Sequence, residues 1–432
     1  MVEDRAPRAR FATDQLVVAT QYENLVLREL EEPRHPVTNA QVTDSDDRLG
    51  LSLINVTHAA GADEGAVLDR LLKDLYERFH DQYDRWVPTI GKNRLLERID
   101  GASGYVGGGD AEGASGYVGG GHAEGVADRE TGSGSVDTES GYVGGGGGGL
   151  PTKATAADIP RSRTGKGGRG VRVAILDTRL YPHPDLAGRY ITEDRDTLLP
   201  DPNGVLYHAG HATFVAGLVI QRAPQVVLDV HNALNDKGEA TAWDVARKMV
   251  EFADAGVSIL NLSLGCFTVD GAPPLLFQRA VELLTPEVVI IAAAGNHGDG
   301  NVPYNVGPKT PFWPAALDDV VAVGAHDSST GQRAPFSPDA PWVTLSAPGV
   351  NVASTYLRGK VEVEAPDKKG KPSCHEYGGY ARWSGTSFAA AAVTGDIAAN
   401  TLPHPSSSRE ALARLREQSR PGVDIWAYDH HK

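Results

Sequence analysis

Beyond residue 160, short apolar runs alternate with segments of helical periodicity. The runs are rich in β-branched residues, are bounded by Gly, Asn or Asp, and lie at 171–176, 226–230, 258–264, 288–295 and 319–325. Apolar positions in 242–256, between two of these runs, follow helical spacing. Strands that are apolar on both faces are typical of parallel sheets covered by helices. The pattern predicts an α/β fold, with a mostly parallel sheet and helices on both faces.

The N-terminal part of the chain has a different pattern. Two strand-like runs, QLVVAT (15–20) and LGLSLINVT (49–57), precede an amphipathic segment at 66–83. The apolar side chains that recur at helical spacing in that segment are Val67, Leu71, Leu72, Leu75 and Phe79. These features predict a small α+β domain over residues 1–100, with the apolar stripe of the helix in its core.

A glycine-rich tract separates the two patterns. Between residues 101 and 149 the heptapeptide SGYVGGG begins at Ser103, Ser115 and Ser140, and small and acidic residues lie between the copies. So few apolar side chains cannot offset the entropy lost on ordering. We therefore assign residues 101–160 to a flexible linker and residues 161–432 to a second domain.

Composition excludes several classes of partner. The formal net charge of -15 disfavours nucleic acid and anionic membranes, which both attract clustered Lys and Arg. The N-terminus lacks the apolar core of a signal peptide, and no run approaches a membrane span. Cys266 and Cys374 are too few for a disulfide framework, and two reduced thiols fit better than one bridge. These features favour a cytoplasmic protein, with secretion by another route left open.

Three residue types with complementary chemistry occur at the ends of predicted elements. Asp177 ends an apolar run, His211 begins a helical pattern, and Ser387 begins a helix of small residues. A serine hydroxyl becomes a good nucleophile only when a base removes its proton, and a carboxylate orients that base. Taken singly, each residue is more often structural than catalytic. Their combination predicts a nucleophilic triad at the carboxyl edge of the sheet.

Six segments in the same order resemble the motifs of the subtilase family, the subtilisin-like serine peptidases. They are VAILDT (173–178), GHATFVAG (210–217), NLSLG (261–265), AAAGN (292–296), LSAPGV (345–350) and SGTSFAAA (384–391). The resemblance covers residues 171 to about 400. It implies a serine endopeptidase with an Asp177–His211–Ser387 triad, whose chain order is that of subtilisin.

The resemblance also implies the residues that contact a peptide or protein substrate. Asn296 would donate a hydrogen bond to the oxyanion. The two edges of the cleft would be Ser263, Leu264 and Gly265 on one side and Lys237, Gly238 and Glu239 on the other. An extended substrate would pair with both edges through its backbone. Glu239 would favour a basic or polar substrate residue.

The proposed chemistry requires no cofactor. Members of this family often bind calcium as a structural ion, and the acidic residues available for it are Asp185, Asp194, Asp196 and Asp201. Their spacing does not match a calcium loop, so solvation at the surface is the preferred interpretation.

Two features leave other functions open. The family commonly has glycine where this chain has Arg179 and Ala212, and Arg179 could pair with Asp177 in competition with His211. The alternatives are a catalytically impaired peptide-binding protein and a transamidase that matures a peptide. The N-terminal domain resembles a prodomain in its position and would then inhibit the enzyme in cis. The alternative is an independent recognition module.

Overall fold

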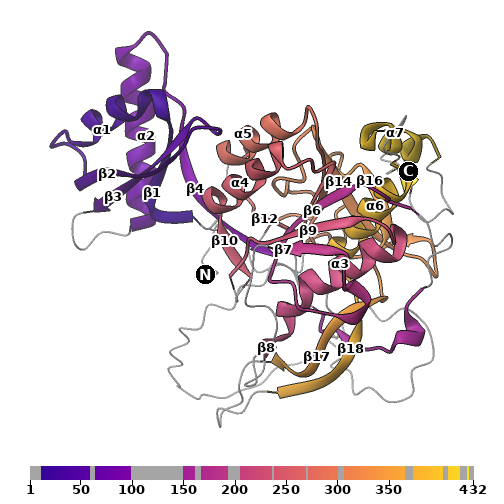
Figure 1. The fold of residues 1–432 in the computed structure, drawn as a ribbon. Helices are drawn as coiled ribbons and strands as arrows, with labels where there is room; N and C mark the ends of the chain where they lie inside the picture. Colours follow the sequence, from indigo (N-terminus) through magenta and orange to yellow (C-terminus); the bar gives the residue numbers. More distant parts are fainter. Residues whose placement is uncertain are drawn as a thin grey trace, which may run out of the picture.

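The computed structural model describes most of the chain outside the glycine-rich tract. Its residues are 11–58, 64–98, 149–160, 167–192, 205–235, 238–268, 271–299, 306–364, 373–401, 407–418 and 426–427. They form an N-terminal unit (residues 11–98) and a C-terminal unit (residues 149–427), which lie side by side in Figure 1.

A mostly parallel sheet runs through the C-terminal unit. The five predicted strands are confirmed within two residues as β6 (Arg172–Asp177), β9 (Val227–Asn232), β11 (Ile259–Leu262), β13 (Val289–Ala293) and β14 (Val320–Asp327). The sheet also contains β7 (Tyr190–Thr192), β15 (Gln332–Arg333), β16 (Leu345–Pro348) and β19 (Trp426–Ala427). Its order is β19-β16-β14-β13-β11-β6-β9-β7, and only the β15 and β19 pairings are antiparallel.

Helices cover both faces of this sheet, as predicted. One face packs against α3 (His211–Arg222) and α6 (Thr386–Asn400), with α7 (Ser408–Gln418) behind α6; the other packs against α4 (Ala242–Glu251) and α5 (Leu275–Leu284). Side chains of β6 alternate between the two cores: Val173 and Ile175 enter the first, Ala174 and Leu176 the second. Strand β6 is therefore apolar on both faces because each face packs against a layer of helices.

A second sheet of the C-terminal unit was not predicted. It has the order β5-β18-β17-β8 and consists of β5 (Thr152–Lys153), β8 (Val205–Leu206), β17 (Val352–Glu364) and β18 (Ser373–Trp383). Because β5 pairs with β18, residues 149–160 belong to the C-terminal unit. The predicted linker boundary at residue 160 is therefore wrong, and residues 99–148 lie outside the described residues.

The N-terminal unit is a small α+β domain. Its elements are β1 (Phe11–Ala19), α1 (Glu23–Leu30), β2 (Val37–Asp46), β3 (Leu51–His58), α2 (Glu64–Gln82) and β4 (Ile90–Arg98). The predicted stripe of α2 is partly correct, because Leu71, Leu75 and Phe79 are buried. The first of the buried residues is Leu68, whereas Val67 and Leu72 are only partly buried.

Strand β4 belongs to both units. Its first half pairs with β1 inside the N-terminal unit. Its second half pairs with β10 (Glu239–Thr241) and β12 (Leu264–Gly265) of the C-terminal unit. One strand thus crosses from the first unit into the second (Figure 1).

Candidate active site

The four residues predicted to carry the chemistry lie at one edge of the parallel sheet. Asp177 is the last residue of β6, His211 the first of α3 and Ser387 the second of α6, while Asn296 follows β13. Carboxyl ends of parallel strands meet at a common edge, which explains why distant segments converge here. All four side chains are buried.

Asp177 and His211 form a buried hydrogen-bonded pair. His211 Nδ1 lies 2.8 Å from Oδ1 and 2.9 Å from Oδ2 of Asp177, and both residues are 0% exposed. The N–H of Thr178 also donates to Oδ1, at 2.6 Å. A carboxylate at Nδ1 keeps the proton there and leaves Nε2 as the acceptor. Nε2 is buried and has no hydrogen-bond partner in the part of the chain that the structure describes.

The start of α6 is joined to the loop that carries Asn296. Thr386 donates from its N–H and its Oγ1 to Asn296 Oδ1, at 3.0 and 3.1 Å. The N–H of Gly295 donates to Thr386 Oγ1 at 3.1 Å, and Gly295 has a φ of 91° that favours glycine. The amide oxygen of Asn296 thus accepts two hydrogen bonds from Thr386. Ser387 follows Thr386 directly, at the positive end of the helix dipole.

The replacements at Arg179 and Ala212 leave this geometry intact. Both carboxylate oxygens of Asp177 face His211, so the expected competition from Arg179 does not displace the histidine. Ala212 lies inside α3, where its N–H donates to Thr178 Oγ1 at 3.1 Å.

The predicted cleft edges correspond to β10 and β12. Gly238 precedes β10 with a φ of 76°, and its N–H donates to Asn235 O at 2.8 Å. A Cβ on Gly265 would lie 2.3 Å from Trp313 O, so only glycine fits there. Ser263 accepts a hydrogen bond from Asn261, whose own oxygen accepts one from α6. Lys237 lies outside the described residues.

The second half of β4 occupies the space between these edges. Leu95, Leu96 and Glu97 pair with β10, while Glu97 and Arg98 pair with Gly265 and Leu264 of β12. All pairings are antiparallel, so β4 runs along β12 from Gly265 toward Leu264, in the direction of Ser263. Leu96 is 0% exposed and packs in an apolar cluster to which both units contribute. Strand β4 thus lies between the two segments predicted to be the edges of the cleft.

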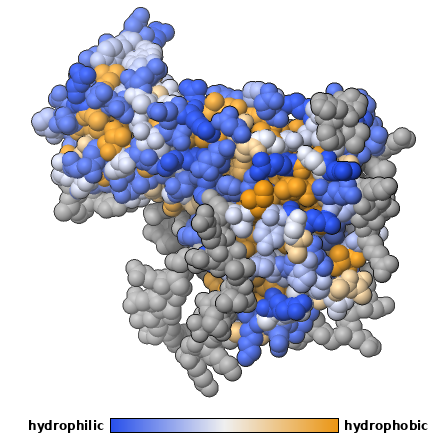
Figure 2. All heavy atoms as spheres, in the orientation of Figure 1, coloured by the Kyte–Doolittle hydropathy of each residue, from blue (hydrophilic) through white to orange (hydrophobic). Residues whose placement is uncertain are grey.

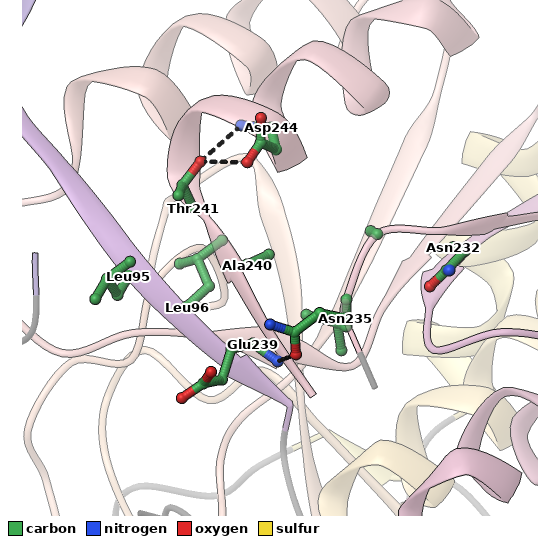
Figure 3. A pocket seen from close by; sticks show the side chains of 10 residues that line it. Leu95, Leu96, Asn232, Asn235, Glu239, Ala240, Thr241 and Asp244 are labelled. Carbon is green, nitrogen blue, oxygen red and sulfur yellow. Dashed lines mark hydrogen bonds between the residues drawn. The ribbon is translucent and has the colours of Figure 1, made fainter. Parts of the chain in front are cut away.

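A pocket of about 430 Å³ lies beside this strand (Figure 3). Leu95 and Leu96 form one wall, and residues 232–235, 239–241 and 244 form the rest. Glu239 is partly buried, with its N–H bound to Asn235 Oδ1 at 3.0 Å. Asp244 is hydrogen-bonded to Thr241 at the start of α4. Glu239 thus lies at the start of β10, beside β4, and its role at a cleft edge and in substrate choice stays a prediction.

His297, next to Asn296, was missed by sequence reasoning. It is 1% exposed, and its Nε2 lies 2.9 Å from Thr310 O. Its ring packs against Phe267 and Trp342. Burial in this apolar surrounding lowers the pKa of His297 to about 4. The one signal that could have identified it is its place directly after the AAAGN motif.

The remaining expectations concern ions, thiols and membranes. The described residues contain no group of three or more side chains suited to a metal ion. Asp185 accepts a hydrogen bond from Tyr380, and Asp194, Asp196 and Asp201 lie outside the described residues. Cys266 and Cys374 are not joined by a disulfide in the structure. None of the described helices is long and apolar enough to cross a membrane.

Comparison with known proteins gives one family and several relatives. Residues 168–421 match the family described as "Subtilase family". The thermophilic serine proteinase of Bacillus sp. strain AK1 is 32% identical over 250 residues, which cover 53% of this chain and 52% of the relative. The thermostable alkaline protease of Halalkalibacterium halodurans is 31% identical over 263 residues, which cover 58% of this chain and 62% of the relative. The match thus spans little more than half the length of these relatives.

Among solved structures, fervidolysin of Fervidobacterium pennivorans, a keratinolytic enzyme related to subtilisin, has a similar fold. Its TM-score is 0.59 at 18% sequence identity, and the match covers 95% of this chain and 58% of that chain. At this identity the similarity shows the fold alone.

Proposed function

Because the chain belongs to the subtilase family, we propose that it is a serine endopeptidase whose nucleophile is Ser387. The observation that supports this most directly is the buried pair of Asp177 and His211, with His211 Nε2 left without a partner among the described residues. Phe388, the residue after Ser387, has its ring 5.5 Å from that of His211. The base and the start of α6 therefore adjoin.

In the proposed mechanism, His211 acts as base and then as acid. Ser387 Oγ attacks the carbonyl carbon of the substrate as its proton passes to Nε2. Asp177 holds the Nδ1 proton and stabilises the imidazolium. His211 then gives its proton to the leaving amine, and water hydrolyses the acyl-enzyme through the same base. The Asn296 amide and the N-terminus of α6 stabilise the oxyanion of each tetrahedral intermediate.

The proposed substrate is an extended peptide segment. The pairing of β4 with β10 and β12 supports a backbone-led mode of binding, which demands little of most side chains. The burial of Leu96 supports a preference for an apolar side chain at that one position. Glu239, on the β10 edge, would add a preference for a basic or polar substrate residue.

We assign the N-terminal unit the role of an inhibitory prodomain. A strand that occupies both cleft edges competes directly with substrate, whereas an independent recognition module would have no need to enter the cleft. Self-cleavage is expected between residues 100 and 160, and within that range before residue 149, because residues 149–160 belong to the C-terminal unit. It would then end the inhibition in cis. The freed N-terminal unit, added in trans, should slow the enzyme.

Labelling and mass spectrometry test the proposal together. A fluorophosphonate should label the wild type but not Ser387→Ala, and mass spectra should show the cut in the wild type only. If both proteins stay full length and unlabelled, the chain is no serine peptidase. If labelling occurs but the N-terminal unit leaves peptide hydrolysis unchanged, only the prodomain role fails.

A further inference from the structure

The His211 ring lies against two aromatic side chains as well as Asp177. The centroid of Trp383 lies 5.7 Å from that of His211, with the rings nearly perpendicular, and Phe388 lies at 5.5 Å. Trp383 and Phe388 contact each other at 5.2 Å. A hydrogen bond at Nδ1 alone lets the imidazole tilt about that bond. Flat surfaces against the ring restrict the tilt and so determine where Nε2 points.

Trp383 is itself held firmly. It is 2% exposed, and its ring contacts Tyr207, Phe214 and Tyr356. Its indole N–H donates to the carbonyl of Gly149 at 2.7 Å. A buried indole N–H needs such a partner, since leaving it unpaired is costly.

The partner carbonyl belongs to a segment that is fixed at several points. Residues 149–153 enter the C-terminal unit beside β18, where Thr152 and Lys153 pair with Arg382 and Ala381. Tyr377, also on β18, donates its hydroxyl to the carbonyl of Pro151. Trp383 therefore links this segment to His211.

We infer that Trp383 is a positioning residue for His211 and that residues 149–153 hold Trp383 in place. This inference rests on the proposed function. The segment after the glycine-rich tract is then part of the catalytic apparatus, although it contributes no group to the reaction.

Three variants, each produced as the full chain, test the inference. Each is assayed beside the wild type after both have completed self-processing. Trp383→Leu loses the flat ring and should lower kcat about 10- to 100-fold, with KM within about twofold, because the misplaced base acts mainly in the transition state. Trp383→Phe keeps a flat ring but loses the N–H and should lower kcat by about 3- to 10-fold. Tyr377→Phe loses only the hydroxyl and should have a smaller effect in the same direction.

Tyr380→Leu is the matched control. Tyr380 lies three residues before Trp383 on β18 and contacts His183 at 4.9 Å instead of His211. Its replacement should leave kcat within about twofold of the wild type, and circular dichroism should show that all four variants are folded. Should Trp383→Leu fail to fold, the two phenylalanine variants still decide the question.

The outcomes distinguish a failure of the positioning role of Trp383 from a failure of the proposed peptidase function. Unchanged kcat in the Trp383 variants, or a rise in KM alone, overturns the positioning role. Equal losses in Tyr380→Leu overturn it too, since they would reflect a general effect on the sheet. A wild type without hydrolysis or fluorophosphonate labelling overturns the proposed function, and the inference falls with it.

Discussion

The N-terminal unit contacts the rest of the molecule in two regions that differ in chemistry. The cleft strand, residues 95–98 of β4, pairs through its backbone and buries Leu96. The α4 contact combines ion pairs with apolar packing. Arg247 pairs with Asp44 at 2.6 Å and with Asp46 at 3.5 Å, and Arg48 pairs with Asp254, just after α4, at 3.1 Å. Buried apolar residues of the N-terminal unit share a cluster with side chains of α4; they are Val17, Ala19, Leu49, Leu51 and Leu53. On the face drawn in Figure 2, the visible surface along the junction of the units is mainly hydrophilic, whereas the apolar cluster is buried.

These two regions should contribute unequally to binding. The arginine side chains of the α4 contact are 43% and 51% exposed, and exposed ion pairs are worth little. The buried leucine and the strand pairing are shielded from water. The ion pairs of the α4 contact should therefore add less to binding than the buried leucine and the strand pairing.

The largest effect is expected from Ser387→Ala, which stops the cleft strand from ever being released by cleavage. Alanine suits a helix start, so the fold should persist while hydrolysis is lost. Peptide hydrolysis and the intact mass measure both consequences. More than a trace of turnover would show that Ser387 is not the nucleophile.

Asn296→Ala tests the catalytic side of the cleft. It should lower kcat about 10² to 10³-fold with little change in KM, because its hydrogen bond forms mainly in the transition state. The magnitude is that known for the corresponding donor of subtilisin, a member of the same family. Asn296→Asp keeps an acceptor for Thr386 but has no donor, and it should lower kcat by as much as Asn296→Ala. A change confined to KM would make Asn296 a ground-state contact.

A change of pH tests the interior next to this site. The pKa of His297 is about 4 in the folded state and about 6.5 when unfolded, so the unfolded chain binds more protons between these values. Its stabilising contribution is present above pH 6.5 and is lost as the pH falls toward 4, a change of about 3 kcal/mol. Urea unfolding at several pH values measures it. His297→Phe should remove this part of the pH dependence, and equal slopes in both proteins would refute the assignment.

Leu96→Ala tests the cleft strand directly. Loss of a buried leucine should weaken inhibition by the N-terminal unit by about 2 to 3 kcal/mol, or about 30- to 150-fold. The assay adds this unit in trans to the processed enzyme and compares inhibition constants. The core of the N-terminal unit does not include Leu96, so its circular dichroism should be unchanged.

Arg247→Ala, in the same assay, tests the α4 contact and should have the smallest effect. Removing exposed ion pairs should cost about 0.5 to 1 kcal/mol, or about two- to fivefold in inhibition. High salt should weaken the wild type to a similar degree. If Arg247→Ala weakened inhibition more than Leu96→Ala did, the ranking of the ion pairs below the cleft strand would be wrong.

Local sequence was sufficient for the strands and helix starts that frame the candidate site. The run that ends at Asp177 is apolar on both faces, and a strand buried between helix layers needs that composition. The small residues after Ser387 fit a helix buried in the core, and α6 begins one residue before it. Order along the chain and the carboxyl-edge rule then sufficed to bring Asp177, His211 and Ser387 to one edge.

The contacts between distant segments depended on the tertiary structure. Strand β4 gave no clear signal because its two halves pair with different units, so no single face is buried along its whole length. The segment at 149–153 was assigned to the linker because its order depends on β18, more than 200 residues away. The sequence thus determined which residues could react. Only the packing of remote segments decided what lies in the cleft and what holds His211 in place.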